Sequence, residues 1–456
     1  MTDALLSVGV DLGTSTTQMI VSRLTVQNTA APFTVPRMEI TSREILYKSP
    51  IHFTPLLSAD TLDAAAIGNL LRQEYDRAGI SPEQIRTGAV IITGETARKE
   101  NARQVLAQIS DLAGEFVVAT AGPALESVLA ARGAGADRLA RERHRPVLHF
   151  DIGGGTSNLA LYDEDGELAD TGCLNIGGRL LKFTPQGQVT YVSPVLDGLD
   201  VPQIGETATP QRLQGLLDTM VEQLVRAAGL LPRTPGEDRW ITDKLPKLPD
   251  KPPILSFSGG VADLILRQEE NWLAYGDLGV LLGRAIAHSD LCRRDYAIGA
   301  ETIRATVVGA GSYATELSGS TVAYEGVSFP LQNLPAVSLT PGEEQLSPDG
   351  LAAIIRQKRS VHEGPVALAM EGNVTSYTDL TRLADGIRAG MEDSNPLVVV
   401  LEKDVGKALG QALICPERAM VCLDGLHVPP GSYLDIAAPA AGGAAVPVVV
   451  KTLAFS

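Results

Sequence analysis

The sequence is poor in aromatic and basic residues. Aromatic residues occupy 4% of the 456 positions, and 38 lysines and arginines stand against 54 aspartates and glutamates, which gives a net charge of −16. Nucleic acids and anionic membranes are bound through basic and stacking side chains, so this composition excludes both as general partners. The first residues, Met1 to Ala4, lack the basic start of a secretory signal, and we expect a cytoplasmic protein.

Patterns of metal-binding and disulfide-forming residues are also missing. The four cysteines form no CxxC pair, and the six histidines show no HxH or HxxxH spacing. This excludes a disulfide framework and argues against a cysteine- or histidine-based metal centre. The apolar stretch at 436–450 is broken by two prolines and two glycines, so it cannot form a membrane helix of about 20 residues.

One pattern occurs twice and divides the chain. An apolar run ending in an acid, a turn rich in glycine and hydroxyl residues, and a second apolar run occur at 5–22 and again at 147–162. Short β-branched runs joined by a tight turn predict a β-hairpin. The duplication predicts two lobes of one topology, residues 1–135 and 146–298, joined by a connector rich in glycine and arginine. A third α/β region is expected over 299–456.

The segments around the hairpins predict an α/β fold. In the first lobe we expect an irregular excursion at 25–60, helices at 64–78, 97–113 and 123–131, and strands at 89–93 and 116–119. In the second lobe we expect helices at 211–228 and 261–266, a proline-rich loop at 230–253 and a strand at 254–258. The third region predicts strands at 302–308, 366–370, 397–401, 419–423 and 446–450, and helices near 376–390 and 405–413.

The two hairpin turns carry residues suited to phosphate. The first reads Asp11-Leu12-Gly13-Thr14-Ser15-Thr16, and the second reads Asp151-Ile152-Gly153-Gly154-Gly155-Thr156-Ser157. Glycines let backbone N–H groups approach phosphate oxygens, and hydroxyls add donors. Asp11 and Asp151 would repel a bare polyphosphate, so we expect them to act through Mg²⁺, which takes one or two carboxylates. A single such turn would be read as an ordinary tight turn, but the matched pair favours a metal and phosphate site.

A third glycine turn, Ser256-Phe257-Ser258-Gly259-Gly260, ends another expected strand. In this order the three turns resemble the phosphate and adenosine motifs of the actin/Hsp70/sugar-kinase ATPase superfamily, over roughly residues 1–295. The resemblance implies two ribonuclease-H-like lobes with ATP or ADP and Mg²⁺ in the cleft between them. It implies phosphate contacts from both hairpins, adenosine contacts from Ser258, Gly259 and Gly260, and a second connecting helix at Gly283-Arg284-Ala285.

One position departs from that superfamily. Hsp70-like members carry a Glu-Pro pair after the strand equivalent to 116–120, and its acid assists the metal-bound water. This chain has Gly122-Pro123 there. Glu95 or Glu126, one helical turn on, would have to substitute as the catalytic carboxylate. We therefore expect slow hydrolysis, since positioning and charge stabilisation supply nearly all the catalysis of phosphoryl transfer.

A closer resemblance extends past the ATPase core. The segments at 307–312, 317–321, 406–410 and 446–453 resemble the ethanolamine ammonia-lyase reactivating factors. That family implies an ATP-dependent chaperone that binds inactivated ethanolamine ammonia-lyase and releases damaged cobalamin, so that intact adenosylcobalamin replaces it. Adenosylcobalamin would then be met only through the client enzyme. The resemblance leaves homo-oligomer formation and association with the ethanolamine bacterial microcompartment open.

The same residues admit other interpretations. A small-molecule kinase of the same superfamily would need a further carboxylate as base, and a filament-forming actin relative would assemble with nucleotide. Gly309-Ala310-Gly311-Ser312 favours a backbone turn over a dinucleotide fingerprint, and Gly406-Lys407 favours a helix start over a P-loop. His427 lacks the spacing of a cobalt ligand, and His149 is expected to be a hydrogen-bonded core residue.

Overall fold

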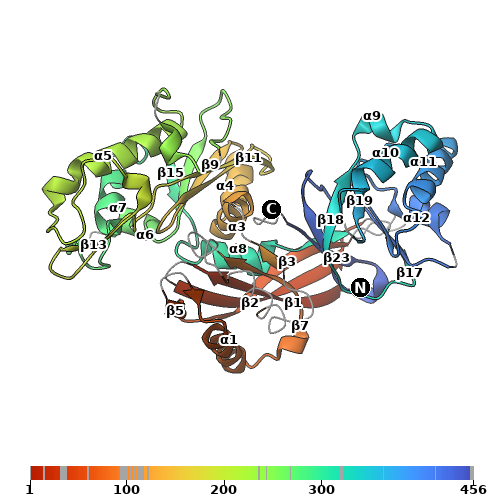
Figure 1. Ribbon diagram of the computed structural model, residues 1–456, viewed down its shortest axis with the longest axis horizontal. Coiled ribbons are helices and arrows are strands. Elements are labelled where there is room, and N and C mark those ends of the chain that lie inside the picture. The colour runs from red at the N-terminus through yellow and green to blue at the C-terminus, as the bar shows by residue number, and fades with distance from the viewer. Residues whose placement is uncertain are drawn as a thin grey trace.

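Three large β-sheets organise the chain in the computed structural model (Figure 1). The structure describes residues 2–13, 16–30, 38–58, 61–92, 101, 105, 109, 118–120, 123–234, 237–242, 244–267, 269–318, 322–362, 364–415 and 417–451. Figure 1 shows the first sheet at the centre, the second lobe on one side of it and the third sheet on the other. The α/β fold class predicted from the sequence is confirmed.

The first sheet has the strand order β3-β2-β1-β7-β8. Its strands are β1 (Thr2–Leu12), β2 (Thr16–Asn28), β3 (Met38–Lys48), β7 (Ile85–Ile92) and β8 (Val118–Thr120), and the short β4 (His52–Phe53) also pairs with β2. The expected hairpin is the antiparallel pair of β1 and β2, whereas β1 and β7 run parallel. The short β5 (Leu56–Ser58) and β6 (Thr61–Leu62) pair with each other beside it.

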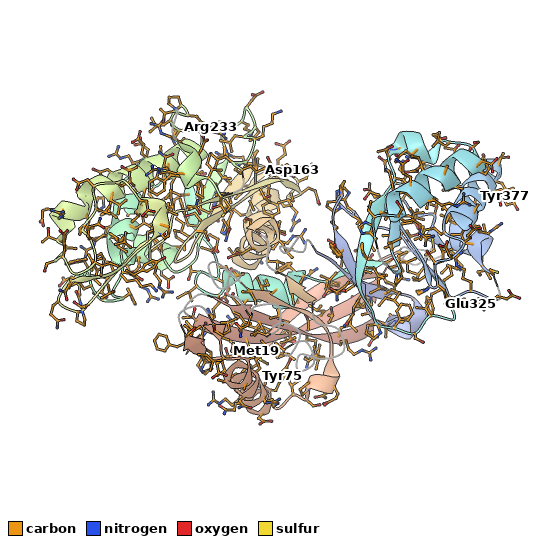
Figure 2. All side chains as sticks on the ribbon, in the orientation of Figure 1. Met19, Tyr75, Asp163, Arg233, Glu325 and Tyr377 are labelled. Atoms are coloured by element: carbon orange, nitrogen blue, oxygen red, sulfur yellow. The ribbon has the colours of Figure 1, made fainter. Side chains whose placement is uncertain are left out.

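Helix α1 (Ala64–Ala78) covers one face of this sheet, as its apolar periodicity predicted. Asp63 caps its first turn by accepting a hydrogen bond from the Ala66 N–H, and Gly79 ends it in the left-handed conformation at φ 67°. Met19 of β2 and Tyr75 of α1 belong to the core between them (Figure 2).

Two sequence expectations in this part of the chain were wrong. The excursion at 25–60 contains β3, an edge strand whose polar middle, Thr41 to Glu44, is exposed and so hides the alternation of a strand. The connector at 132–145 contains α4 (Ala136–Arg143), in which Arg141 pairs with Asp137 one turn earlier while Ala136 and Ala140 face the core. The helix expected at 97–113 lies largely outside the described residues.

The second sheet repeats the order of the first as β11-β10-β9-β14-β15. Its strands are β9 (Val147–Ile152), β10 (Ser157–Tyr162), β11 (Leu168–Leu174), β14 (Ile254–Ser258) and β15 (Tyr296–Ile298). The remaining elements of this lobe are the paired β12 (Leu181–Phe183) and β13 (Val189–Val192), and helices α5 (Pro210–Ala227), α6 (Ala262–Leu266) and α7 (Gly279–Ala287). Matching strand orders confirm the duplication that the sequence predicted.

Helices α3 (Pro123–Ala134) and α8 (Ala305–Tyr313) cross between the lobes, α3 against the second sheet and α8 against the first (Figure 1). Two expectations are corrected here. Residues 302–308 are not a strand, because their β-branched run Thr306-Val307-Val308 lies in a helix that is buried on all sides and so shows no periodicity. Gly283-Arg284-Ala285 lies inside α7, so α8 is the helix that crosses α3.

The crossing depends on glycine at both helix surfaces. A Cβ on Gly309 would lie 1.9 Å from the carbonyl oxygen of Leu129, and one on Gly133 would lie 1.9 Å from that of Ala305. A Cβ on Gly9 of β1 would lie 2.4 Å from the carbonyl oxygen of Val307. The two lobes therefore meet through backbone contacts that admit no side chain.

The third sheet has the order β16-β23-β22-β18-β19-β20-β21-β17. Strands β18 (Leu331–Ser338), β19 (Ala367–Met370), β20 (Leu397–Leu401) and β21 (Met420–Leu423) run parallel, and β16 (Glu316–Ser318), β17 (Ala323–Glu325), β22 (Tyr433–Ile436) and β23 (Val446–Lys451) are antiparallel to their neighbours. Helices α9 (Pro341–Glu344), α10 (Pro348–Arg359), α11 (Tyr377–Gly390) and α12 (Gly406–Leu413) lie among them. The last four expected strands and both expected helices are confirmed.

A cluster of small and aliphatic residues joins the third sheet to the first. Leu5, Leu24 and Met38 pack against three alanines that precede β23, Ala440, Ala441 and Ala445. The Ala441 N–H also donates to the Asp3 carboxylate at 2.8 Å. In the described part of the chain, no helix is both long and apolar enough to cross a membrane.

Replacing Gly309 tests the helix crossing. Gly309→Ala should lower the free energy of unfolding by about 2 kcal/mol or more, because the new methyl group would meet a backbone carbonyl that cannot move without separating the helices. Gly215→Ala is the matched control. It lies on the exposed face of α5 with open space around it, so alanine should raise stability by about 1 kcal/mol. Urea unfolding measures both, and an unaltered Gly309→Ala protein would contradict the close crossing.

Candidate functional site

A cavity of about 420 Å³ lies where the two lobes face each other. The first hairpin contributes Asp11, Gly13 and Thr16 to its lining, and the second contributes Asp151 and the turn 153–156. Gly259 and Gly260 of the third turn line it as well. The three turns that the sequence singled out thus surround one cavity, while Thr14 and Ser15 lie outside the described residues.

The two hairpins share an equivalent backbone hydrogen bond at their turns. The Gly13 N–H donates to the Thr16 carbonyl at 2.9 Å, and the Gly153 N–H donates to the Thr156 carbonyl at 2.9 Å. Each aspartate also faces an amide side chain across its hairpin. Asp11 is the register partner of Gln18, and Asp151 is the register partner of Asn158. The hairpin geometry fixes an acid and an amide together in both lobes.

Glu126 of α3 joins the two aspartates. Burial raises its pKa well above the usual range, and the charges of Asp151 and Asp11 raise it further, while a hydrogen bond with Asn158 opposes them. Burial also raises the pKa of Asp151 to about 6, against a hydrogen bond from Ser258. Glu126 thus lies in one cavity with two aspartates whose charges disfavour its ionisation. Glu95 lies outside the described residues.

The amides opposite the aspartates are incompletely bonded. Among the described residues, no partner reaches the buried Oε1 of Gln18 or the buried Oδ1 of Asn158, and both residues line the cavity. Amide oxygens facing carboxylates fit a hard cation with its bound waters. The described residues hold no group of three or more histidine, cysteine or acidic side chains that could hold a metal ion by themselves.

Ser157 and Ser258, two of the predicted site residues, form hydrogen bonds inside the second lobe and do not line the cavity. The Ser258 hydroxyl is buried and donates to Asp151, and His149 lies 2.8 Å from Ser258 through Nε2 and 3.0 Å from Ser256 through Nδ1. Burial lowers the pKa of His149 to about 3, so this core histidine is neutral. The Ser157 hydroxyl donates to the Ile176 carbonyl at 2.7 Å.

The third turn approaches the cavity by backbone alone. Gly259 has φ 88°, and a Cβ there would lie 2.3 Å from the Ile152 carbonyl oxygen. Only glycine allows this approach to the second hairpin. Of the three residues predicted for adenosine, Gly259 and Gly260 line the cavity and Ser258 supports Asp151 from behind.

Sequence reasoning missed several lining residues. Gln18 and Asn158 each follow their aspartate by seven residues, and this repeated interval was the signal that could have found them. Arg179 and Asp277 carried no such signal. Arg179 Nε lies 3.3 Å from the Asp277 carboxylate, which also accepts from the Gly279 N–H at 2.8 Å and so caps α7 at the cavity wall.

Two lobes of matching strand order around a cavity with three glycine turns define the actin-like ATPase fold. The chain belongs to the family described as ethanolamine utilisation protein EutA, whose model matches residues 3–456. It is 38% identical over its whole length to proteins named ethanolamine ammonia-lyase reactivase EutA from Salmonella typhimurium and Escherichia coli, covering 99% of each. It is also similar to a Ppx/GppA family structure from Aquifex aeolicus at 11% identity, over 67% of this chain and 97% of that one, with a TM-score of 0.41. The fold assignment rests on the strand order.

The raised pKa of Asp151 predicts a pH-dependent stability of the nucleotide-free protein. Since its folded pKa of about 6 exceeds the unfolded value of 3.8, the stabilising contribution is complete below about pH 4 and is lost as pH rises through 6. The free energy of unfolding of Asp151→Asn should therefore exceed that of wild type by almost nothing at pH 4 and by about 2 to 3 kcal/mol at pH 8. Exposed Asp165→Asn is the control, and urea titrations across pH that show the same profile for both variants would contradict the assignment.

Proposed function

We propose that the cavity binds ATP or ADP with Mg²⁺. Asp11 and Asp151 would hold the metal from opposite lobes, and the unbonded amide oxygens of Gln18 and Asn158 would accept from its waters. The backbone N–H groups of the two hairpin turns would contact the phosphates, and Gly259 and Gly260 would leave room for the nucleoside. Mg²⁺ would neutralise the charge of the phosphates, and the protein would hold the nucleotide in position.

Glu126 is the proposed carboxylate for the attacking water. It stands on α3 and lines the same cavity as both aspartates, whose charges raise its pKa. With those charges offset by a cation, its carboxylate could accept a proton from a water in the cavity. Among the described residues, two other acids line the cavity, and each already has hydrogen-bond partners. Asp263 accepts a hydrogen bond from the Thr302 hydroxyl. Asp277 pairs with Arg179 and accepts a hydrogen bond from the Gly279 N–H at the start of α7. This favours hydrolysis over transfer to a small alcohol, which would need a separate base.

We infer that hydrolysis drives reactivation of ethanolamine ammonia-lyase, with release of damaged cobalamin so that intact adenosylcobalamin replaces it in the client. The single observation that carries this inference is the pair of matched acid-and-amide hairpins facing one cavity, in a chain 38% identical end to end to proteins named reactivases. Lobe closure about the α3–α8 crossing would couple nucleotide to client, provided the client binds the two nucleotide states with different affinity. The third region, 299–456, is a proposed client contact.

Removing either aspartate should weaken metal-dependent nucleotide binding. Asp11→Ala and Asp151→Ala are each expected to lose about 2–4 kcal/mol of MgATP affinity, the scale of a broken desolvated charge interaction. Their affinity without Mg²⁺ should change far less. Asp165→Ala, in the exposed turn at the other end of β10, should bind as wild type. Calorimetry with and without Mg²⁺ measures this, and equal losses in both conditions would refute the metal role.

The reactivation reaction tests the function as a whole. Inactivated ethanolamine ammonia-lyase mixed with this protein, free adenosylcobalamin and MgATP should regain activity, and ADP alone should not sustain it. Glu126→Gln should bind MgATP normally yet slow both hydrolysis and reactivation by about 10² or more, the usual contribution of a general base. Recovery that is equally fast without ATP would refute the coupling, and hydrolysis unchanged in Glu126→Gln would refute the role of this carboxylate.

A further inference from the structure

The lining of the cavity is short of positive charge for a ligand that carries phosphate. Among the described residues that line it, acids outnumber basic residues: Asp11, Glu126, Asp151, Asp263 and Asp277 stand against Arg179 and Arg267. A nucleoside polyphosphate adds further negative charge, of which one Mg²⁺ offsets only a part. A basic side chain held close to the phosphates would therefore strengthen their binding.

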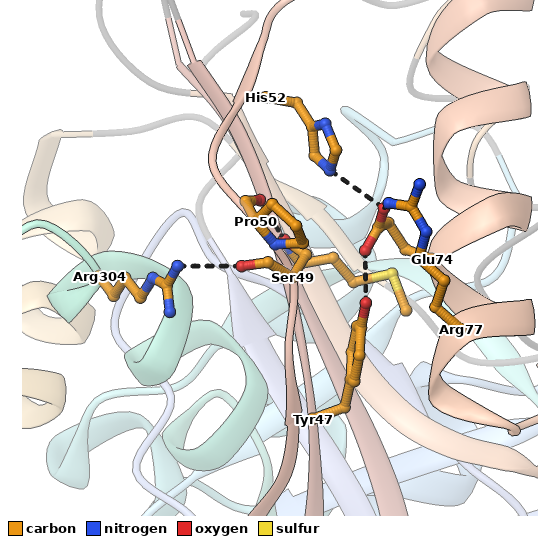
Figure 3. Close-up of polar contacts among 8 residues, drawn as sticks. Tyr47, Ser49, Pro50, His52, Glu74, Arg77 and Arg304 are labelled. Carbon is orange, nitrogen blue, oxygen red and sulfur yellow. Dashed lines mark hydrogen bonds and ion pairs between the residues drawn. The ribbon is translucent and has the colours of Figure 1, made fainter.

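The arginines on the first-lobe side are engaged away from the cavity. The Arg304 guanidinium donates to the Ser49 carbonyl at 3.0 Å, and that of Arg77 pairs with the buried Glu74 (Figure 3). Neither arginine lines the cavity. Within the described residues, the first hairpin thus faces the cavity with its acid, its amide and its turn, and with no basic side chain.

The second lobe contributes both arginines of the cavity, and they differ in how firmly they are held. Arg267 follows α6, its side chain is 72% exposed, and it lies 3.8 Å from the Asp263 carboxylate. The Arg179 side chain is 35% exposed, and its Nε lies 3.3 Å from Asp277, whose own side chain is 8% exposed. A buried carboxylate therefore fixes Arg179, whereas Arg267 lies largely in solvent.

Backbone contacts place Arg179 against the second hairpin turn. The Arg179 N–H donates to the Gly154 carbonyl at 2.6 Å, and the Gly178 N–H donates to the Gly153 carbonyl at 3.0 Å. A Cβ on Gly177 would lie 2.3 Å from the Gly154 carbonyl oxygen, so glycine is needed for this approach. The stem of Arg179 covers the turn, because a Cβ on Gly154 would lie 3.2 Å from its Cδ. The guanidinium is thus held beside the turn that is proposed to contact phosphate.

The ion pair with Asp277 leaves most of the guanidinium available. One carboxylate oxygen of Asp277 accepts from the Gly279 N–H at 2.8 Å, and the other accepts from Arg179 Nε. Burial raises the pKa of Asp277, against the bond from Gly279 and the charge of Arg179. Among the described residues, the two terminal nitrogens of Arg179 have no hydrogen-bond partner. Their N–H donors form the planar fork that matches phosphate oxygens.

We infer that Arg179 is a phosphate-binding residue of the cavity, and that Asp277 is the positioning residue that orients its guanidinium. The inference rests on the proposed function, to which it adds a side-chain contact beside the backbone N–H groups of the turns. Because the fork can donate to two phosphate oxygens at once, Arg179 makes affinity depend on the phosphate chain of the nucleotide. The aspartates hold the metal, and Arg179 binds phosphate oxygens directly.

Calorimetry of the full-length protein with MgATP, MgADP and adenosine tests the contact. Arg179→Gln should weaken MgATP and MgADP binding by about 10- to 100-fold, the range of hydrogen bonds to charged groups, and leave adenosine binding within about twofold of wild type. Arg179→Lys should recover part of the affinity, because it keeps the charge and loses the fork. Arg267→Gln, which removes the same charge from the cavity, is the control and should weaken all three ligands by about threefold at most.

A double variant separates a phosphate contact from a purely structural ion pair. Arg179→Gln alone leaves the buried carboxylate of Asp277 without its partner, which by itself would disturb the second hairpin. The double variant Arg179→Gln, Asp277→Asn removes both charges and should still lack about tenfold or more of the MgATP affinity.

Three results would overturn the inference. They are wild-type MgATP affinity in the double variant, an equal loss of adenosine and nucleotide binding in Arg179→Gln, and a phosphate-selective loss of the same size in Arg267→Gln. A wild type with no affinity for MgATP or MgADP would instead overturn the proposed function and, with it, this inference.

Discussion

The enclosure of three carboxyl groups in one cavity is the constraint on which the site depends. Asp11 comes from one lobe, Asp151 from the other, and Glu126 from the helix between them; burial raises the pKa of Asp151 and of Glu126, and the charges of both aspartates raise the pKa of Glu126 further. A folded protein retains such a cluster only where the surrounding structure compels it. Here the two hairpins and α3 do so, and a cation with phosphate would relieve the repulsion. The instability of the empty site and the proposed affinity for a metal-bound ligand would then have the same origin.

The helix crossing makes that cluster adjustable. Gly133 and Gly309 let α3 and α8 touch through their backbones, so the lobes share a contact with no side chains to interlock. Glu126 stands on one of these helices, and Arg304 begins the other. A change in the angle between the helices would therefore move Glu126 and Arg304 together.

The sequence predicted the duplicated hairpins, and through them both lobes and the three turns around the cavity. It could not predict α8, because a helix buried on every side carries no 3.6-residue pattern and Thr306-Val307-Val308 favours a strand by composition. Gln18 and Asn158 were not predicted as lining residues, because each lies opposite its aspartate only through the register of a strand pair. The residue types alone do not reveal that register. Ser258 was assigned to the nucleoside from resemblance, while its hydroxyl supports Asp151 from within the lobe.

The alanine-rich junction between the third sheet and the first has a mechanical consequence. The junction packs Ala440, Ala441 and Ala445 against Leu5 and Met38. The Asp3 carboxylate also accepts a hydrogen bond from the Ala441 N–H, so these contacts attach the third sheet to the first lobe. The second lobe lies on the opposite side of the first (Figure 1). A small rotation at the hinge would be magnified into a long arc at the far edge of the third sheet. A ligand that changed the angle between the lobes would therefore displace the far edge of the third sheet by more than it moved the cavity walls.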